Sequence, residues 1–361
     1  MQDIQKIGCA GAFIDKIKDL WDSVRSDQKR RLYPFVYHYV REYRYDFGIP
    51  EVEVNGLEHM YYRTVASNLS KIESAIRMLQ IFQREGISAI PLKGLALIET
   101  VYRDPGIRPM ADIDLMVDRN DFQSVKDILT DMGYAFVDSF RGSIDFTDMQ
   151  NELFDIHAQF TKFDALFHID YAEIRSRLRS VSIGGQIQTG ILCPEHQVIH
   201  IALHLAPGLY TGLNFLNLID LYYVIADPGR PLDWDYFAAF STRARMNSYL
   251  YAPLFLCRQL FNAEIPESIL GILCRGLSKK KIAHVRNDCL ESILNGGGAA
   301  QGLFLERLWW AEKFPNKMRL VRSALFPDRA EMAQRFSVPD TSVRIYWYYL
   351  VRLRKLIDSL C

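Results

Sequence analysis

One internal stretch of the sequence, residues 86–190, contains the short apolar runs typical of strands, whereas the segments on either side have helical periodicity. Three runs are "GISAIPLKG", "ADIDLMV" and "GYAFVDSF", and "SIDFTDMQNELFDIHAQF" indicates a hairpin. Between the second and third runs, residues 121–132 are predicted to be helical, with Asn120 or Asp121 as the cap. This order predicts an α+β fold with a small mixed sheet.

The flanking segments are predicted to be helical. The first fifty residues indicate two or three helices that end near Gly48 and Pro50, and residues 57–84 repeat apolar side chains at steps of three and four. From Pro194 onward the helical period returns and predicts a large helical bundle. We expect an N-terminal helical segment at 1–56, an α/β core at 57–190 and a C-terminal helical domain at 191–361.

Composition narrows the class of protein. Of the 361 residues, 49% are hydrophobic and 24% charged, which is ordinary for a soluble folded chain. Lys plus Arg and Asp plus Glu number 43 each, so no global field attracts nucleic acid or an anionic membrane. We find no secretory leader and no apolar run near the length of a membrane span. We therefore expect a cytoplasmic protein without a nucleic-acid or membrane partner.

The run "IRPMADIDLMV" places Asp112 and Asp114 one residue apart in an apolar context. Successive side chains of a strand point to opposite faces, so these two carboxylates are expected to share one face. Like charges that close raise one another's pKa unless a positive charge lies between them, and a divalent cation commonly provides it. The pair predicts a metal site.

The sequence "PLKG" lies upstream of that pair. A mostly apolar strand, residues 87–92, is predicted to end at Lys93 and Gly94, where a helix begins at once. The free backbone N–H groups of a helix start can hold a phosphate, and Lys93 and Arg108 would add positive charge. A plain strand-to-helix corner is the alternative interpretation.

The run "NELFDIHAQF" adds a third acidic residue within a strand. Alternation puts Asp155 and His157 on one face, and Phe154 and Ile156 on the other. Asp155 could therefore join the acidic pair. The alternative is a half-exposed strand whose carboxylate is simply solvated.

His196, His200 and His204 stand four residues apart in "PEHQVIHIALHLA", a spacing that could bind a metal ion. The glutamate of the H-E-x-x-H pattern is missing, and apolar residues flank the last two histidines. We therefore favour packing or a hydrogen-bonded role in the core over metal binding.

The order "PLKG", helix, "YRDPGIRPMADIDLMV", helix, "GY" and "FDIHAQF" resembles the nucleotidyltransferase superfamily of the DNA polymerase beta fold. More narrowly it is similar to a branch of uncharacterised bacterial nucleotidyltransferases, and "CPEHQVIHIALHLA" and "LNLIDLYYVI" extend the likeness into the C-terminal half. The resemblance implies a mixed-sheet nucleotidyltransferase core flanked by helices. It also implies metal-dependent transfer of a nucleoside monophosphate from a nucleoside triphosphate to a hydroxyl of a small molecule, peptide or protein.

The resemblance also implies roles for particular residues. Two Mg²⁺ ions, or Mn²⁺, would be held by three carboxylates with catalytic roles, namely Asp112, Asp114 and Asp155. Three residues would bind the nucleotide: Lys93, Gly94 and Arg108. His157 would orient Asp155 or meet the substrate. This chain departs from the superfamily in having Leu95 directly after the glycine and a longer gap before Asp112, so residues 101–109 are expected to loop out.

Two further interpretations come from other classes of protein. In the first, a catalytically inactive descendant uses the same fold to bind a nucleotide or a partner. In the second, a metal-free scaffold uses its helical half as an interaction surface. Three intact carboxylates argue against the inactive descendant, because unpaired aspartates on buried strands cost stability.

Overall fold

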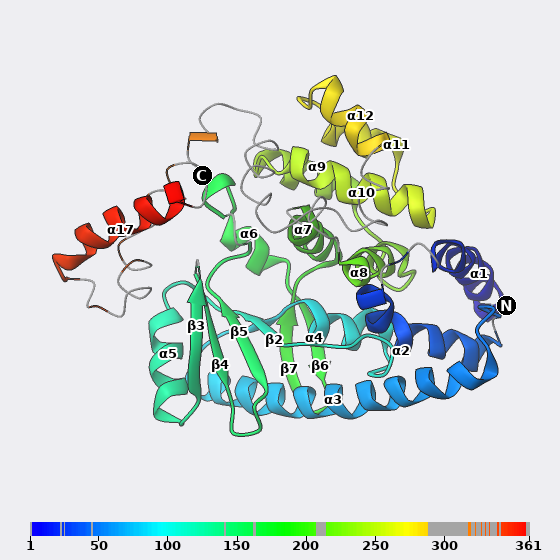
Figure 1. Cartoon of the computed structure of the whole chain (residues 1–361), viewed down its shortest axis with the longest axis horizontal. Helices are drawn as coiled ribbons and strands as arrows, with labels where there is room; N and C mark the ends of the chain where they lie inside the picture. Colours follow the sequence, from blue (N-terminus) through cyan, green and yellow to red (C-terminus); the bar gives the residue numbers. More distant parts are fainter. Residues whose placement is uncertain are drawn as a thin grey trace.

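A computed structural model describes residues 2–21, 24, 26–44, 46–140, 142–161, 164–206, 214–287 and 341–358, with isolated positions between 317 and 338. Three helices open the chain: α1 (Gln2–Trp21), α2 (Ser26–Tyr43) and α3 (Glu51–Arg84). The long α3 runs beneath the sheet in Figure 1. It begins at Glu51 rather than at 57, directly after Pro50, so the expected boundary between residues 56 and 57 falls inside a helix.

The central sheet has five strands in the order β1-β2-β5-β4-β3. The strands are β1 (Ile90–Pro91), β2 (Ile113–Met116), β3 (Ala135–Phe140), β4 (Ser143–Thr147) and β5 (Leu153–His157). The predicted hairpin is confirmed as the antiparallel pair β4 and β5, whereas β2 and β5 are parallel. The sheet is therefore mixed, and the predicted α+β fold is confirmed.

The two faces of this sheet meet different layers. Apolar side chains of β2, β4 and β5 pack with α3 and α5 (Phe122–Asp131) in one hydrophobic core; they are Ile113, Leu115, Ile144, Phe146, Phe154 and Ile156. By alternation the polar residues of β2 and β5 lie on the opposite face. That face turns toward α7 (Pro194–Leu205), whose His200 hydrogen-bonds the chain just beyond β5.

Short elements connect the sheet to the helical half. They are α4 (Lys93–Leu97), a π-helix η1 (Ile98–Tyr102), a 3₁₀ turn η2 (Asp164–Leu166), α6 (Tyr171–Ser176) and the hairpin β6 (Arg179–Ile183) and β7 (Ile187–Ile191). Strand β1 is only two residues long, shorter than the predicted 87–92. Helix α5 is present as predicted, but the side chain of its N-cap Asp121 makes no capping hydrogen bond.

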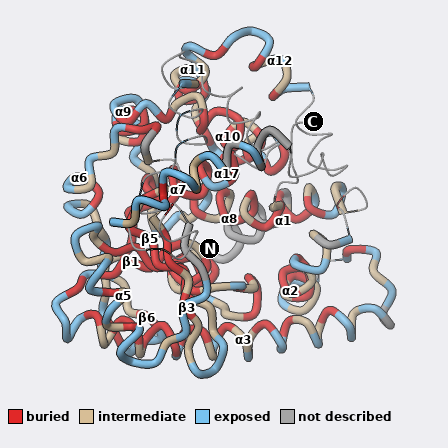
Figure 2. The backbone as a smooth tube through the Cα atoms, turned by 60° about the vertical axis from the view of Figure 1, so that its left-hand side comes forward, coloured by how far each residue is buried: buried red, intermediate tan, exposed pale blue. Residues whose placement is uncertain are grey.

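The C-terminal half is helical as expected. Its described helices are α7, α8 (Phe215–Ala226), α9 (Trp234–Arg243), α10 (Asn247–Phe261), α11 (Glu267–Leu273), α12 (Lys279–Asn287) and α17 (Arg344–Asp358). One hydrophobic core joins helices α7 to α12 with α1 and α2, so the N-terminal helices pack against this helical region. Figure 2 shows buried residues gathered where β1 and β5 approach α7. Parts of the predicted bundle, including 288–316, lie outside the described residues.

Among the residues that the structure describes, every helix is too short or too polar to cross a membrane. The expected three-part division at 1–56, 57–190 and 191–361 stays a prediction.

Candidate functional site

Asp114 and Asp155 lie side by side on the polar face of the sheet. They are register partners on the parallel strands β2 and β5, and both are buried, with 3% and 7% of their surface exposed. With His157 they form a group whose potential metal-binding atoms all lie within 4.8 Å of one another. The sequence-based expectation that Asp155 stands beside the strand of Asp114 is confirmed.

Two nitrogen groups contact Asp114. The Lys93 ammonium Nζ lies 2.5 Å from Oδ1 of Asp114, and Nε2 of His157 lies 3.0 Å from the same oxygen. A carboxylate only accepts, so His157 donates from Nε2. Burial alone would raise the pKa of Asp114, but Lys93 and His157 more than offset this and hold that pKa well below its usual range. The carboxylate is therefore ionised at neutral pH.

Asp155 is less well satisfied. Its Oδ2 lies 3.3 Å from Nε2 of His157, whereas its Oδ1 is buried and has no hydrogen-bond partner. A buried carboxylate oxygen without a partner costs free energy, so such an atom calls for a ligand. Two carboxylates and an imidazole whose possible ligand atoms lie within 4.8 Å of one another are a donor set that suits a divalent cation such as Mn²⁺ or Mg²⁺. The residues present therefore fit the metal that was expected.

Asp112 lies at the edge of this group rather than within it. Strand β2 begins at Ile113, so Asp112 precedes the strand and is half-buried. Burial raises the pKa of Asp112, the neighbouring Asp114 carboxylate raises it further, and Lys93 acts in the opposite direction. The close group of possible ligands within the described residues is Asp114, Asp155 and His157, while the predicted metal role of Asp112 stays a prediction.

Lys93 and Gly94 form the predicted corner between β1 and α4. Lys93 has a φ of 43°, in the left-handed region that most side chains avoid. The Asp114 carboxylate more than offsets the effect of burial and raises the pKa of Lys93, so its side chain keeps a positive charge. A Cβ on Gly94 would lie 2.6 Å from both Nη1 of Arg108 and Cγ of Met110. Any larger residue here would have to displace those two side chains.

Arg108 contacts a carboxylate of the helical half. Its Nε and Nη2 donate to the oxygens of Asp220 on α8, at 3.0 Å to Oδ1 and 2.8 Å to Oδ2. The Tyr102 hydroxyl donates to the same Asp220 at 2.7 Å. All three side chains are buried. Arg108 was predicted to bind nucleotide; in this geometry its guanidinium joins the segment before β2 to α8.

The segment 101–109 does not loop out, and that expectation is wrong. Asn68 of α3 is fully buried and holds this segment through both ends of its amide. Its Nδ2 donates to the carbonyl oxygens of Pro105 and Arg108, at 2.6 and 2.8 Å, and its Oδ1 accepts from the Met110 N–H at 3.1 Å. The longer gap before the acidic strand is therefore an inward strap, which we define as residues 103–110.

The histidines of α7 are divided between the interior and the surface. His196 and His200 are buried, and burial lowers their pKa values to about 4 and about 3. Nε2 of His196 lies 2.8 Å from the Tyr236 hydroxyl, and Nδ1 of His200 donates to the Phe160 carbonyl at 2.9 Å. His204 is exposed. The favoured role in packing and hydrogen bonding therefore agrees with the positions of His196 and His200.

The family assignment rests on the sequence as a whole. A protein-family model described as an uncharacterised nucleotidyltransferase matches residues 22–262, which is most of the chain. The chain belongs to this family. The matched region includes every residue of the site described above, and the nucleotidyltransferase resemblance seen in the sequence is confirmed. Membership implies transferase chemistry with a nucleoside triphosphate as substrate, and nucleotidyltransferases generally use divalent metals.

Two other comparisons add little to this nucleotidyltransferase assignment. The crystal structure of an antigenic nucleotidyltransferase-like protein from Paracoccidioides brasiliensis is similar to 65% of this chain and 97% of its own, with a TM-score of 0.31 and 15% sequence identity. No curated protein matches the chain.

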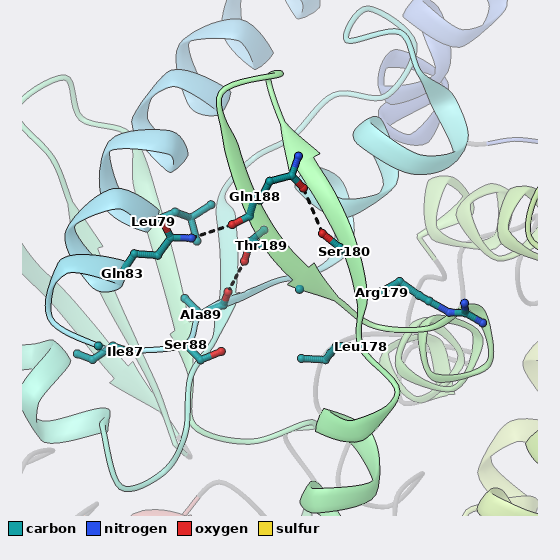
Figure 3. Close-up of a pocket in the computed structure, with 12 residues that line it drawn as sticks. Leu79, Gln83, Ile87, Ser88, Ala89, Leu178, Arg179, Ser180, Gln188 and Thr189 are labelled. Carbon is teal, nitrogen blue, oxygen red and sulfur yellow. Dashed lines mark hydrogen bonds between the residues drawn. The ribbon is translucent and has the colours of Figure 1, made fainter.

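A groove on the surface of this nucleotidyltransferase lies away from the carboxylates. Its volume is about 590 Å³, and it is bordered by the end of α3, residues 86–89 and the hairpin β6–β7. Figure 3 shows Gln83 donating to the Gln188 carbonyl at 2.7 Å and Thr189 donating to the Ala89 carbonyl at 3.0 Å. Residues 86–89 precede β1 and Lys93 follows it, so this groove lies beyond the end of β1 opposite Lys93.

Sequence reasoning missed the residues that fix the site from outside the sheet. Asn68 and Asp220 were not singled out, although both are almost fully buried. A signal for Asp220 was available, because it is the lone carboxylate in the apolar helix "FLNLIDLYYVIA". No comparable signal identifies Asn68, which lies in a helix that contains many polar residues.

Proposed function

We propose that the chain is a metal-dependent nucleotidyltransferase that transfers a nucleoside monophosphate from a nucleoside triphosphate to a hydroxyl group and releases pyrophosphate. The acceptor is a small molecule, a peptide or a protein, because the equal numbers of acidic and basic residues do not favour a nucleic acid. The proposed location is the cytoplasm.

The observation that carries the proposal is the pairing of Asp114 with Asp155. Two buried carboxylates in register on parallel strands, one of them with an unpartnered Oδ1, are costly for a fold to maintain. In a site that binds a cation and an acceptor hydroxyl, the carboxylate pair would hold the cation and the unpartnered oxygen would accept the proton of the hydroxyl. Family membership supplies the reaction class to which this geometry is suited.

In the proposed reaction the acceptor oxygen forms a bond to the α-phosphorus, and the bond between that phosphorus and the β-phosphate oxygen breaks. Asp155, through its unpartnered Oδ1, takes the proton of the acceptor hydroxyl. His157 donates to Asp114 and lies beside Oδ2 of Asp155, so it orients both carboxylates. When bound, the divalent cation would lower the pKa of the acceptor hydroxyl and offset charge on the phosphates.

The residues that would hold the cations are the carboxylates Asp114 and Asp155, with Asp112 at the half-exposed edge and His157 as their hydrogen-bonding neighbour. The number proposed is two ions of Mg²⁺ or Mn²⁺. Lys93 is the proposed charge partner of the triphosphate, and Gly94 is proposed to keep the corner close enough for backbone contact. Arg108 is proposed as a second nucleotide-binding residue. Its guanidinium is already paired with Asp220, so this ion pair would have to open or be shared before Arg108 contacts a phosphate.

A second candidate is a catalytically inactive nucleotide-binding module. One observation favours it: Lys93 and His157 already supply Asp114 with two donors, so this carboxylate does not need a cation to be stable. The two candidates differ in turnover. An inactive module would bind a triphosphate without releasing pyrophosphate.

The experiment that tests the proposal uses α-labelled ATP, GTP, CTP and UTP in separate incubations with Mg²⁺ or Mn²⁺ and a metabolite and protein extract. Label on an acceptor, with equimolar pyrophosphate, is the expected result for at least one nucleotide. Asp155→Asn is the matched control, because it keeps the shape of the side chain. Label on the protein itself is measured without extract and subtracted. Triphosphate binding with no pyrophosphate from any nucleotide would favour the inactive module.

A further inference from the structure

We infer that Lys93 is an internal counterion that occupies the cation position on Asp114 in the empty site and leaves it when the metal and triphosphate arrive. The inference rests on the proposed function and concerns the order in which that site is filled. Before the nucleotide binds, Lys93 competes with the metal ion for Asp114. After the nucleotide binds, Lys93 contacts the phosphates.

One oxygen of Asp114 carries two contacts. Oδ1 of Asp114 receives both the Lys93 ammonium, at 2.5 Å, and Nε2 of His157, at 3.0 Å. Two such charge-assisted contacts occupy the lone-pair positions of this oxygen, which is the one that His157 contacts. A cation bound by Asp114 and Asp155 through this oxygen would approach the Lys93 ammonium, and the two positive charges would repel one another.

The contact that must be broken is strong. Lys93 forms an ion pair with Asp114, and the more distant carboxylates of Asp112 and Asp155 add to the attraction. The Asp114 side chain has only 3% of its surface exposed, which leaves little water to screen the attraction. Metal alone must displace Lys93 against this attraction and brings no anion to receive the ammonium.

The Lys93 ammonium has other positions available to it once it leaves Asp114. The Lys93 side chain is 17% exposed, so it can reach a ligand from solvent without unfolding of the corner. It also borders a small cavity with Gln197 and His200. Nδ1 of His200 donates to the Phe160 carbonyl, which leaves Nε2 as a lone-pair acceptor, and this atom is buried without a partner. The protein therefore offers the ammonium a second position, and the triphosphate offers a stronger one.

The consequence is an opposite effect of one substitution on two ligands. Neutralising Lys93 removes the competitor of the metal, so metal alone should bind more tightly. The same change removes a charge partner of the phosphates, so the metal-bound triphosphate should bind more weakly. If Lys93 had only a structural role, its substitution would weaken the binding of both ligands, because Asp114 would lose the contact that positions it.

The test measures Mn²⁺ binding without nucleotide, by electron paramagnetic resonance of the free ion, for the full chain and three variants. Lys93→Gln keeps a hydrogen-bond donor without the charge, Lys93→Arg keeps the charge, and Asp114→Asn reports whether the ion binds at this carboxylate. We expect Lys93→Gln to bind Mn²⁺ roughly tenfold to a hundredfold more tightly than the wild type, the range set by one charge-assisted hydrogen bond. Lys93→Arg should bind it about as weakly as the wild type.

A second measurement on the same variants uses a non-hydrolysable triphosphate with Mg²⁺, for which Lys93→Gln should lose affinity. Unchanged or weaker Mn²⁺ binding by folded Lys93→Gln would overturn the inference while leaving the metal centre in place. If neither the wild type nor any variant binds Mn²⁺, or if Asp114→Asn binds it as tightly as the wild type, the proposed metal centre is overturned as well. If Lys93→Gln does not fold by circular dichroism, Lys93→Met takes its place under the same criteria.

Discussion

Asp114 on β2 and Asp155 on β5 are register partners on parallel strands, although they lie 41 positions apart in the chain, with α5 and the strands β3 and β4 between them. The pairing depends on β5 returning to the sheet beside β2 rather than at its edge. It places two carboxylates on the face that turns toward α7, where Lys93 and His157 meet them. The predictions below follow from these contacts.

Asp112 and Asp114 should differ in what they contribute to stability. Asp114→Asn leaves the Lys93 ammonium without its main partner, and breaking a buried ion pair costs about 3 to 5 kcal/mol. Asp112→Asn removes a half-buried carboxylate whose pKa is raised, so the free energy of unfolding should be unchanged or increase by up to about 1 kcal/mol. Urea unfolding of both variants checks the contrast, and equal losses would mean that Lys93 does not depend on Asp114.

The Asn68 clamp should be a major support of the strap at residues 103–110. Asn68→Ala leaves two carbonyl oxygens and one N–H of the strap unpaired, and each costs about 1 kcal/mol or more when buried. A loss of about 3 kcal/mol in the free energy of unfolding is expected. Glu73→Ala on the same helix removes only an exposed ion pair and should cost less than about 0.5 kcal/mol. Similar costs for the two variants would contradict the role of the clamp.

Arg108 and Asp220 should behave as one unit. Asp220→Asn and Arg108→Met each leave a buried charge without its partner, and each should cost about 3 to 5 kcal/mol. The double variant should cost much less than the sum of the two, which gives a large coupling energy in a double-mutant cycle. Additive losses would show that the Arg108 guanidinium is stabilised by groups other than Asp220. Arg108 would then be free to make its predicted contact with the triphosphate.

Mild acid should destabilise the fold through α7. His196 and His200 have pKa values of about 4 and about 3, below the usual 6.5, so between pH 6.5 and 4 the unfolded chain binds protons that the native chain does not. Stability is therefore fully present above pH 6.5 and is lost as the pH falls. Each imidazole contributes up to about 1.4 kcal/mol per pH unit.

The control for this pH dependence is His200→Asn, whose amide can still donate to the Phe160 carbonyl. The slope of the free energy of unfolding between pH 6 and 4.5 should fall by about the contribution of one imidazole. A slope identical to that of the wild type would show that His200 does not remain neutral in the native state.

Local patterns allowed much of this structure to be predicted. Alternation in "FDIHAQF" placed Asp155 and His157 on one face, because side chains on a strand have a period of two whatever the sheet contains. The helical period after Pro194 likewise predicted α7 and α8. The same alternation assigned Asp112 to β2, but the strand begins one residue later, and strand ends depend on hydrogen bonds that a single sequence does not reveal.

Contacts between distant segments could not be predicted in the same way. The strap was expected to loop out because its length exceeds that of the superfamily pattern, and its burial depends on Asn68, which lies 35 or more residues earlier. Arg108 was expected to face a phosphate because it precedes the acidic strand, yet its partner Asp220 lies 112 positions away. Charge and position along the chain did not indicate which opposite charge the fold would bring to it.

The most direct test of the account is the rate of pyrophosphate release with an identified nucleotide and acceptor, compared between the wild type and Asp155→Asn under saturating Mn²⁺. Asp155 is proposed to take the proton of the attacking hydroxyl through its unpartnered Oδ1. The account predicts a rate lower by roughly 10²- to 10⁴-fold, the usual cost of losing a general base, with little change in triphosphate affinity. A folded Asp155→Asn variant that keeps near-normal turnover would contradict it.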